Sequence, residues 1–493
     1  MNESAMNRRS IVTLLTALLM ALLSACTAGP DFRVPDHAMV KSPSANAPFH
    51  SGDEAIYISA PLPDHWWRLY EDARLDAYVA EALAANTDLR AADANLKRAS
   101  YIVREAEAGR TIQTTISGGA DISRIGGFTG PGSSYTYNLG AGVSYPLDLA
   151  GGIKRGIEAA RANSEAEQAA RDQVRVAVAA AVTRSYAAAC SANVTLAATR
   201  RVLEVQRQTL QVTTRLASGG RGTAFDVTRA RAAVDQSAAA IPGVLASRQA
   251  ALYELAALMG RAPADYPREA EECAAPPSLR QVIPIGDGAA LLSRRPDVRA
   301  AERRLHAATA TIGVETAELY PHISLGGSMG FAGPFSTFLS GNGFGGSLGP
   351  LLSWTFPNRS VAHARIAEAG ASAEAASANF DGTVIEALRQ TETALSAYAR
   401  EADRNHALTL TQGDTLKASD QASRLYHFGR TNFIDVLSAE ASLANAEATL
   451  AQSRATLVDR QVDLFLALGG GWTDGPEGTE TKESSTRVKA NAR

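Results

Sequence analysis

The chain has 493 residues, which is long enough for two or three domains. Its 48 lysine and arginine residues almost balance its 51 aspartate and glutamate residues, so the charge excludes a nucleic-acid partner held by a basic surface. After residue 25 the sequence has no apolar run of the roughly 18 residues that a membrane-crossing helix needs. We therefore expect no helical membrane span in the mature chain.

Residues 1–25 have the organisation of a signal peptide, with two arginines followed by an apolar run at 11–23. Small residues stand directly before Cys26, as in a bacterial lipobox, so we expect cleavage before Cys26 and a covalent lipid on it. An ordinary signal peptide followed by a chance cysteine is the alternative. Lipid chains anchor a protein to one leaflet of a membrane. Thr27 occupies the place where an inner-membrane retention signal would carry aspartate, which favours the outer membrane.

The mature chain contains an internal duplication with an offset of 209 residues. The run 215–221 and the following Phe-Asp-Val at 225–227 recur at 424–430 and, as Ile-Asp-Val, at 434–436. The predicted divisions are a signal peptide at 1–25, a lipidated extended segment at 26–64, a first repeat at 65–262, an inter-repeat linker at 263–285, a second repeat at 286–471 and a disordered polar tail at 472–493.

Each repeat is expected to contain a helix, two strands and a second helix, in that order. Residues 65–108 and 157–218 contain no glycine or proline, which predicts two long helices. The second of these would extend for roughly 90 Å at about 1.5 Å per residue. In the second repeat, 361–428 has no proline and 432–468 has neither residue. Helices of this length need partners along their sides, so a coiled-coil-like bundle is expected.

Strands with a period of two are predicted between the helices. Their expected ranges are about 110–124, 134–148, 321–333 and 343–356. Alternating segments of about ten residues with aromatic ends suit the wall of a membrane barrel, although a half-buried soluble sheet gives a similar pattern. Four strands cannot close a barrel, and lipid does not tolerate open strand edges. Three chains, contributing twelve strands, are therefore expected to close one barrel.

Two cysteines would remain unlipidated after processing. Export places Cys190 and Cys273 in an oxidising compartment. Cys190 lies in a predicted long helix, and Cys273 lies in the loop that follows the returning helix, which is expected to end near Met259. A loop that folds back would bring the two thiols together. The sequence is thus compatible both with a disulfide and with two separate thiols.

Several short motifs follow one another along the chain. They are Gly29-Pro30-Asp31-Phe32 after Cys26, Trp66-Trp67, Asn86 with Asp88-Leu89, the run from Arg294 to Glu302, Tyr320-Pro321, Asp435-Val436-Leu437 and the run from Ala467 to Trp472. With these motifs and its duplication, nearly the whole mature chain resembles the TolC/OprM-like outer membrane efflux proteins. In particular, the chain resembles the lipoprotein (NodT) subgroup of resistance-nodulation-division efflux systems.

The resemblance implies a mainly α fold with a β-barrel portion, assembled as a homotrimer. A twelve-strand β-barrel in the outer-membrane lipid would continue into a twelve-helix periplasmic α-barrel, with the inter-repeat linker in an equatorial region. The two matched turns would lie at the periplasmic tips, where a periplasmic adaptor (membrane fusion) protein and an inner-membrane efflux pump dock.

The function implied is passive conduction of small amphiphilic compounds, such as drugs and toxic organics, to the exterior. The alternatives are an exit duct for type I protein secretion, metal-ion efflux, and a non-conducting structural lipoprotein that spans the envelope. The alternating strands argue against the structural lipoprotein, which would not need a barrel wall.

Charged residues near the two matched turns are candidates for the channel entrance, because a trimer converts each lumen-facing charge into a ring of three. The candidate gate residues are Asp226, Asp435, Arg221, Arg430 and Tyr426. Stabilisation of a helix N-terminus is the alternative for the two aspartates, and packing is the alternative for the tyrosine. Members of the family often carry a second aspartate one turn after the Asp435 position. Here that position is Ser438, which weakens the case for a double acidic ring.

The turns themselves are expected to provide the docking surface for the adaptor. The residues assigned to the tip turns are Gly219, Gly220, Gly429, Arg215 and Arg424. A helical hairpin commonly needs a left-handed residue, which glycine supplies. Solvated helix-end charges are the alternative reading of the arginines.

No constellation for catalysis or metal binding is visible. The eight histidines are scattered, and none lies at a metal-binding spacing from cysteine, aspartate or glutamate. The sequence therefore predicts no enzyme, no metal and no cofactor other than the lipid on Cys26.

Overall fold

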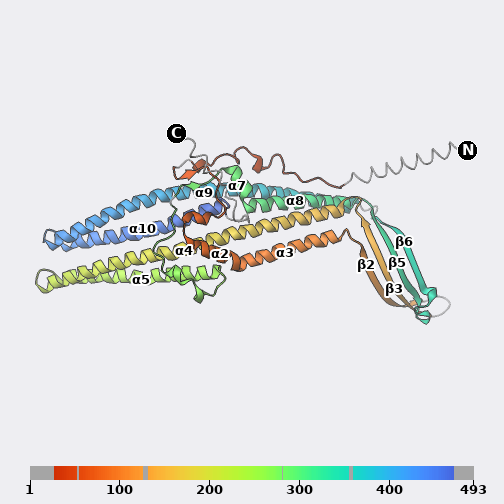
Figure 1. Cartoon of the computed structure of the whole chain (residues 1–493), viewed down its shortest axis with the longest axis horizontal. Coiled ribbons are helices and arrows are strands. Elements are labelled where there is room, and N and C mark those ends of the chain that lie inside the picture. The colour runs from red at the N-terminus through yellow and green to blue at the C-terminus, as the bar shows by residue number, and fades with distance from the viewer. Residues whose placement is uncertain (1–26, 53–54, 126–131, 280, 355–358, 471–493) are drawn as a thin grey trace, which may run out of the picture. The chain divides into compact units, whose positions relative to one another are not determined.

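The computed structural model describes most of the chain (Figure 1). The residues described are 27–52, 55–125, 132–279, 281–354 and 359–470. The predicted signal peptide, Cys26 and the predicted tail at 472–493 lie outside them. The chain divides into two compact units. The strand unit comprises the N-terminal residues to Ser42, 92–170 and 297–385, and the hairpin unit comprises 43–91, 171–296 and the residues from Glu386.

The strand unit contains a four-stranded antiparallel sheet of order β2-β3-β5-β6. Its strands are β2 (Gln113–Ile125), β3 (Gly132–Leu147), β5 (His322–Pro334) and β6 (Phe344–Ser353). All four predicted strands are therefore present, although residues 355 and 356 of the last predicted range lie outside the described residues. The two repeats meet where β3 pairs with β5, in a register that places Leu139 opposite Phe331.

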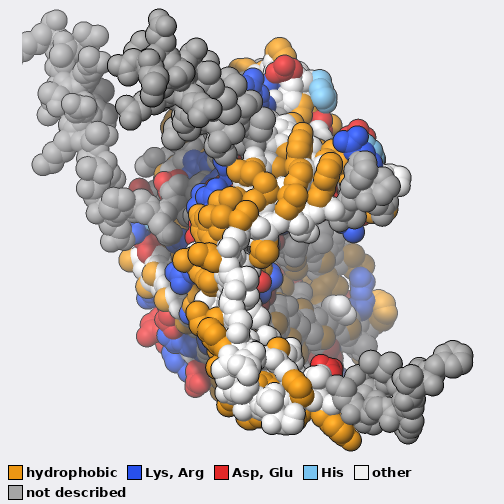
Figure 2. All heavy atoms as spheres, turned by 90° about the vertical axis from the view of Figure 1, so that its right-hand side faces the viewer, with side chains coloured by type: hydrophobic (Ala, Val, Ile, Leu, Met, Phe, Trp, Pro, Cys, Tyr) orange, Lys and Arg blue, Asp and Glu red, His pale blue; other side chains and the backbone are white. Residues whose placement is uncertain are grey.

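Large apolar side chains of the sheet are exposed in the single chain. Ile116 is 85% exposed and Leu348 is 91% exposed. Figure 2 looks onto the strand end of the molecule, where hydrophobic side chains gather over the strands. Exposed aromatic residues lie near both ends of the strands: Tyr135, Phe335, Phe338 and Phe344 towards the hairpin loops, and Tyr145, Tyr320 and Trp354 towards the helices. This distribution is typical of strands that cross a bilayer.

Four helices contribute to the strand unit. They are α3 (Thr87–Ala108), α8 (Pro296–Ala317) and the first parts of α4 (Gly152–Ser218) and α9 (Arg359–His427). The bounds of α3 and α8 differ by the same 209 residues that relate the sequence repeats. No helix in the described part of the chain has the length and apolarity to cross a membrane.

The prediction of one continuous helix over 65–108 was wrong. The structure has a 3-10 turn at Trp66–Tyr70, then α2 (Ala73–Ala85), and α3 begins after a break at Asn86. The Asn86 side chain accepts hydrogen bonds from the N–H groups of Asp88 at 2.9 Å and Leu89 at 3.1 Å. Side chains that cap a helix end compete with continuation of the helix, and a scan for glycine and proline does not detect them.

The hairpin unit is formed by two pairs of long helices, which lie side by side in Figure 1. The second part of α4 pairs with α5 (Ala224–Leu258), and the second part of α9 pairs with α10 (Phe433–Ala467). Shorter elements complete the unit: β1 (Tyr57–Ile58), α6 (Arg268–Glu271), β4 (Ile283–Pro284) and α7 (Gly288–Arg294).

A compact core in the hairpin unit joins segments from both repeats and the linker. Trp66 is fully buried and stacks on Phe465, with ring centroids 4.7 Å apart. Strand β1 pairs with β4 in parallel, which connects the N-terminal segment to the inter-repeat linker. A disulfide joins Cys190 to Cys273, across 83 residues of sequence, and fixes the loop after α5 to α4.

Loss of this disulfide is expected to destabilise the hairpin unit. Replacement of Cys273 by Ser should lower the free energy of unfolding by about 2–4 kcal/mol, because the crosslink closes a long loop in the unfolded chain. Thermal unfolding followed by circular dichroism, with and without reductant, measures the effect. The Cys190→Ser/Cys273→Ser double variant is the control and should not respond to reductant, whereas a wild-type chain that also does not respond would contradict the prediction.

Candidate functional site

Two turns of the same construction join the long helices of the hairpin unit. In the turn between α4 and α5, the N–H of Arg221 donates to the carbonyl of Leu216 at 2.8 Å. In the turn between α9 and α10, the N–H of Arg430 donates to the carbonyl of Leu425, also at 2.8 Å. This bond satisfies a carbonyl that the end of the helix leaves without a partner. The duplicated sequence thus produces a duplicated tip.

Only two of the three predicted turn glycines need to be glycine. Gly220 has a φ of +71° and Gly429 a φ of +67°, the left-handed region in which other residues are strained. Gly219 is not among the residues with positive φ. Its counterpart in the second repeat is Phe428, which shows that the position accepts a side chain. Gly219 thus lies in the tip turn, as predicted, but it is not the left-handed residue of that turn.

Both candidate aspartates lie in the first turn of the helix that follows a tip. The carboxylate of Asp226 accepts hydrogen bonds from the hydroxyl and the N–H of Thr223, and the Thr223 hydroxyl accepts from the N–H of Asp226. Asp435 is held in a similar way by Thr431 and Asn432. The hydrogen bonds from Thr223 lower the pKa of Asp226. Both carboxylates therefore stabilise helix N-termini, and this role does not exclude a further one in a channel.

The four predicted arginines are exposed around the tips. Arg215 and Arg424 lie in the last turns of α4 and α9, where a positive charge favours the helix C-terminus. Arg221 and Arg430 follow the turn glycines. None of the four forms an ion pair with a carboxylate in the described part of the chain, so their guanidinium groups face solvent in the single chain.

Tyr426 joins the second tip to the first. It is half-buried, its ring lies 5.8 Å from that of Phe433, and its hydroxyl hydrogen-bonds the buried Thr213 on α4. Burial raises the pKa of Tyr426, and the neighbouring charge of Asp226 contributes to the rise. Tyr426 thus packs at the contact between the two helix pairs.

Two buried acids along the same contact were not predicted from the sequence. Glu440 on α10 is 4% exposed and accepts a hydrogen bond from Thr209 on α4, while its second carboxylate oxygen has no partner in the described chain. Glu447 is 9% exposed. Burial raises the pKa of both groups. Their spacing of seven residues places them on one face of α10, a signal that was present in the sequence.

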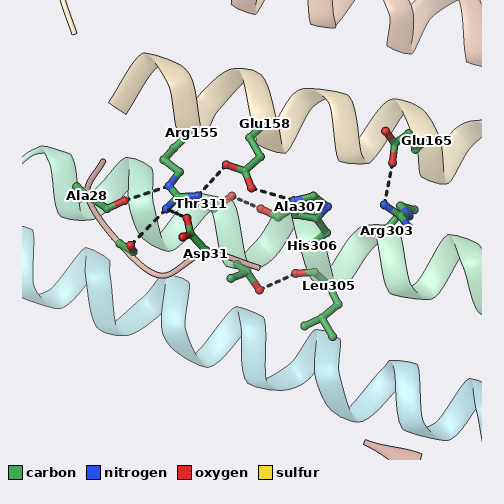
Figure 3. A network of polar contacts seen from close by, with 12 residues as sticks. Ala28, Asp31, Arg155, Glu158, Glu165, Arg303, Leu305, His306, Ala307 and Thr311 are labelled. Carbon is green, nitrogen blue, oxygen red and sulfur yellow. Dashed lines mark hydrogen bonds and ion pairs between the residues drawn. The ribbon is translucent and has the colours of Figure 1, made fainter. Parts of the chain in front are cut away.

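A second polar cluster, in the strand unit, was also missed (Figure 3). Arg155 on α4 is 3% exposed, and its guanidinium donates to the carbonyl of Ala28 at 3.1 Å, the carbonyl of Gly29 at 3.3 Å and the carboxylate of Asp31 at 2.7 Å. It also donates to Glu158 at 2.8 Å. The segment that follows Cys26 is thereby fixed to α4.

Helix α8 holds the same segment from its other side. His306 lies 2.9 Å from Glu158, and its ring stacks on Phe32 with centroids 4.4 Å apart. Gly29, with a φ of +80°, lies so close to Gly313 that a Cβ at Gly29 would be 2.4 Å from the Gly313 Cα. The Gly-Pro-Asp-Phe motif pointed to this segment, but nothing in the sequence identified Arg155 as its partner. We call Arg155, Glu158 and His306 the N-terminal clamp.

No group of three or more potential metal ligands occurs among the residues that the structure describes.

The positive φ of Gly429 gives a prediction with an internal control. Gly429→Ala should reduce the free energy of unfolding of the hairpin unit by about 1–2 kcal/mol, because alanine is strained in the left-handed region. Gly219→Ala should have little effect, since its Cβ would lie 3.5 Å from its nearest neighbour, an ordinary contact. Thermal unfolding of both purified variants measures the two losses of stability. Equal losses in Gly429→Ala and Gly219→Ala would contradict the prediction.

The buried acid Glu440 gives a pH-dependent prediction. Because burial raises its pKa above 4.5 in the folded chain, the folded state holds the proton more tightly than the unfolded state. Stability should therefore fall as pH rises from about 4.5 through the folded pKa, and Glu440→Gln should flatten this slope. Glu374→Gln, at an exposed position of α9, is the control. Equal slopes of melting temperature against pH in wild type and Glu440→Gln would refute the assignment.

Comparisons with known proteins agree with this architecture. The family model described as "Outer membrane efflux protein" matches residues 78–261 and 289–470. "Nodulation protein T" of Rhizobium leguminosarum bv. trifolii is 29% identical over 464 residues, which cover 93% of this chain and 97% of that protein. The "Toluene efflux pump outer membrane protein TtgC" of Pseudomonas putida is 27% identical over 469 residues, covering 92% of this chain and 95% of that protein.

Among solved structures, the outer-membrane channel OprN superposes with a TM-score of 0.83 at 33% sequence identity. The match covers 91% of this chain and 100% of that one. The family model spans both repeats, and the superposition includes both the strands and the long helices. The chain therefore belongs to the outer membrane efflux protein family and is an outer-membrane channel component of an efflux system.

Proposed function

We propose that three copies of this chain form the exit channel of a tripartite efflux system, which passively conducts small amphiphilic compounds such as drugs and toxic organics. The observation that carries the proposal is the four-stranded sheet with its exposed apolar side chains. Within one chain the sheet ends at β2 and β6. In the trimer, β6 of one copy pairs with β2 of the next and closes a barrel of twelve strands.

Closure follows from the properties of lipid. The hydrocarbon core offers no hydrogen-bond partner to the N–H and C=O groups along a strand edge, so a spanning sheet must have no edge. Along β3, Gly140, Gly142 and Ser144 alternate with larger apolar residues. Small and polar residues on one face of the wall suit a water-filled lumen. The long helices continue the duct into the periplasm as a twelve-helix barrel.

The energy for transport comes from elsewhere in this proposal. An inner-membrane pump and a periplasmic adaptor deliver the substrate, and the adaptor docks on the exposed arginines around the two tips. The chain makes and breaks no bonds, so it is not an enzyme and needs no metal or cofactor. A lipid on Cys26 anchors it to the outer membrane. The name of the Pseudomonas relative, a toluene efflux protein, supports a small apolar cargo.

The gate proposal can be tested at Asp435 with two variants that separate charge from helix capping. Asp435→Asn removes the charge and keeps an oxygen that can accept from Thr431, whereas Asp435→Ala removes both. If a ring of three charges narrows the entrance, both variants should raise the single-channel conductance of the purified trimer in planar bilayers.

Asp420→Ala, at an exposed position of α9, is the matched control and should leave the conductance unchanged. A change in Asp435→Ala alone would assign the residue to helix capping. Wild-type conductance in both variants would show that Asp435 is not a gate residue.

The transport function is tested by retention of a fluorescent amphiphilic dye in cells that lack this chain. Deletion should increase retention, and restoration of the wild-type chain should return it to the original level. Equal export in all three strains would contradict amphiphile efflux by this channel. Measurement of secreted proteins and of metal-ion sensitivity in the same strains would then decide between type I secretion and metal efflux, and no defect in any assay would favour the non-conducting structural role.

A further inference from the structure

A cavity of about 390 Å³ lies in the strand unit beside the first described residues of the chain. Its wall includes Thr27, Leu149, Ala150, Thr316, Tyr320 and Ile323, and none of the described residues that line it is charged. Its volume falls within the roughly 300–1,000 Å³ range of small-molecule sites, which are mostly apolar. The cavity therefore suits an apolar ligand, or the uncharged apolar part of a larger one.

The chain enters this cavity at the residue that follows the predicted lipid attachment. Thr27 lines the wall, and Cys26 precedes it by one peptide bond, a Cα separation of about 3.8 Å. The N–H of Ala28 donates to the carbonyl of Ala150 at 2.8 Å, and Ala150 also lines the cavity. A group carried on the Cys26 side chain would thus start within reach of the cavity.

The N-terminal clamp keeps the chain at this point. Arg155 donates hydrogen bonds to the carbonyls of Ala28 and Gly29 and to the carboxylate of Asp31, so the segment that follows Thr27 is held along α4. A tether that is already ordered loses less entropy when its end binds than a free tether does. The clamp therefore favours binding of whatever the preceding residue carries.

The cavity also lies where a bilayer boundary is expected. Strand β3 ends at Leu147 and β5 begins at His322, so Leu149, Ala150 and Tyr320 occupy the junction between strands and helices. Tyr320 is 52% exposed, and exposed aromatic side chains are enriched at the boundary between lipid and water. Acyl chains of a lipid anchor enter the membrane at this level.

We propose that the cavity binds an acyl chain of the lipid carried by Cys26, so that the anchor is held against its own chain at the base of the barrel. This inference rests on the lipidation of Cys26 in the proposed function. An acyl chain of a membrane phospholipid and a side chain of a neighbouring copy are the competing occupants.

Photocrosslinking of the full-length protein in cells tests the proposal. Cells are grown with a fatty acid that carries a diazirine and an alkyne, and the purified protein is analysed by mass spectrometry before and after irradiation. The wild-type chain should carry the label on Cys26 and, after irradiation, adducts on the peptides that contain Leu149 and Tyr320. Labelled Cys26 without these adducts overturns the cavity proposal alone. Unlabelled Cys26 overturns the lipidation and the cavity proposal together.

Two variants identify the occupant. Thr316→Phe fills the cavity and should abolish the adducts while Cys26 stays labelled, whereas Thr311→Phe, at an exposed position of the same helix, should retain them. A chain with Cys26→Ser, exported by a leader that needs no lipidation, should lose the adducts as well. Adducts that persist in it would assign the cavity to membrane phospholipid, and adducts that persist in Thr316→Phe would show that the label does not enter the cavity. Either result overturns the proposal.

Discussion

The backbone hydrogen bonds of a strand in lipid must all be satisfied, and the rest of this molecule follows from that constraint. In the described part of the chain the antiparallel sheet has four strands, with edges at β2 and β6. Its large apolar side chains, such as Leu348, are exposed until lipid covers them. In the proposed trimer the sheet is one section of a larger wall, so the chains must assemble before the sheet can be stable in lipid.

The duplication determines how much of the chain could be predicted from sequence. Helices α4 and α9 end at Ser218 and His427, and helices α5 and α10 begin at Ala224 and Phe433. Both pairs keep the 209-residue offset that the tip motifs show. Long uninterrupted helices and alternating strands repeat their signal many times, so the four strands and the paired helices were predicted within a few residues.

Features that depend on a single side chain were not predictable in the same way. The break at Asn86 depends on two hydrogen bonds that its side-chain oxygen accepts from backbone N–H groups, and no glycine or proline marks it. The clamp pairs Arg155 with Asp31, which lies 124 residues away in sequence, and the burial of Glu440 depends on α4. Periodicity shows which face of a helix is apolar. It does not show which distant segment covers that face.

The pairing of β3 with β5 makes each chain a tandem of two similar but unequal halves. In the proposed trimer the barrel therefore has pseudo-sixfold symmetry, with true threefold symmetry beneath it. The two halves differ at the contact between the helix pairs: the counterparts of Tyr426 and Glu440 in the first repeat are Ala217 and Arg231. Three of the six hairpins of the proposed trimer therefore carry a half-buried tyrosine and a buried acid at this contact, and the other three carry an alanine and an arginine, so the two kinds of hairpin are not chemically interchangeable.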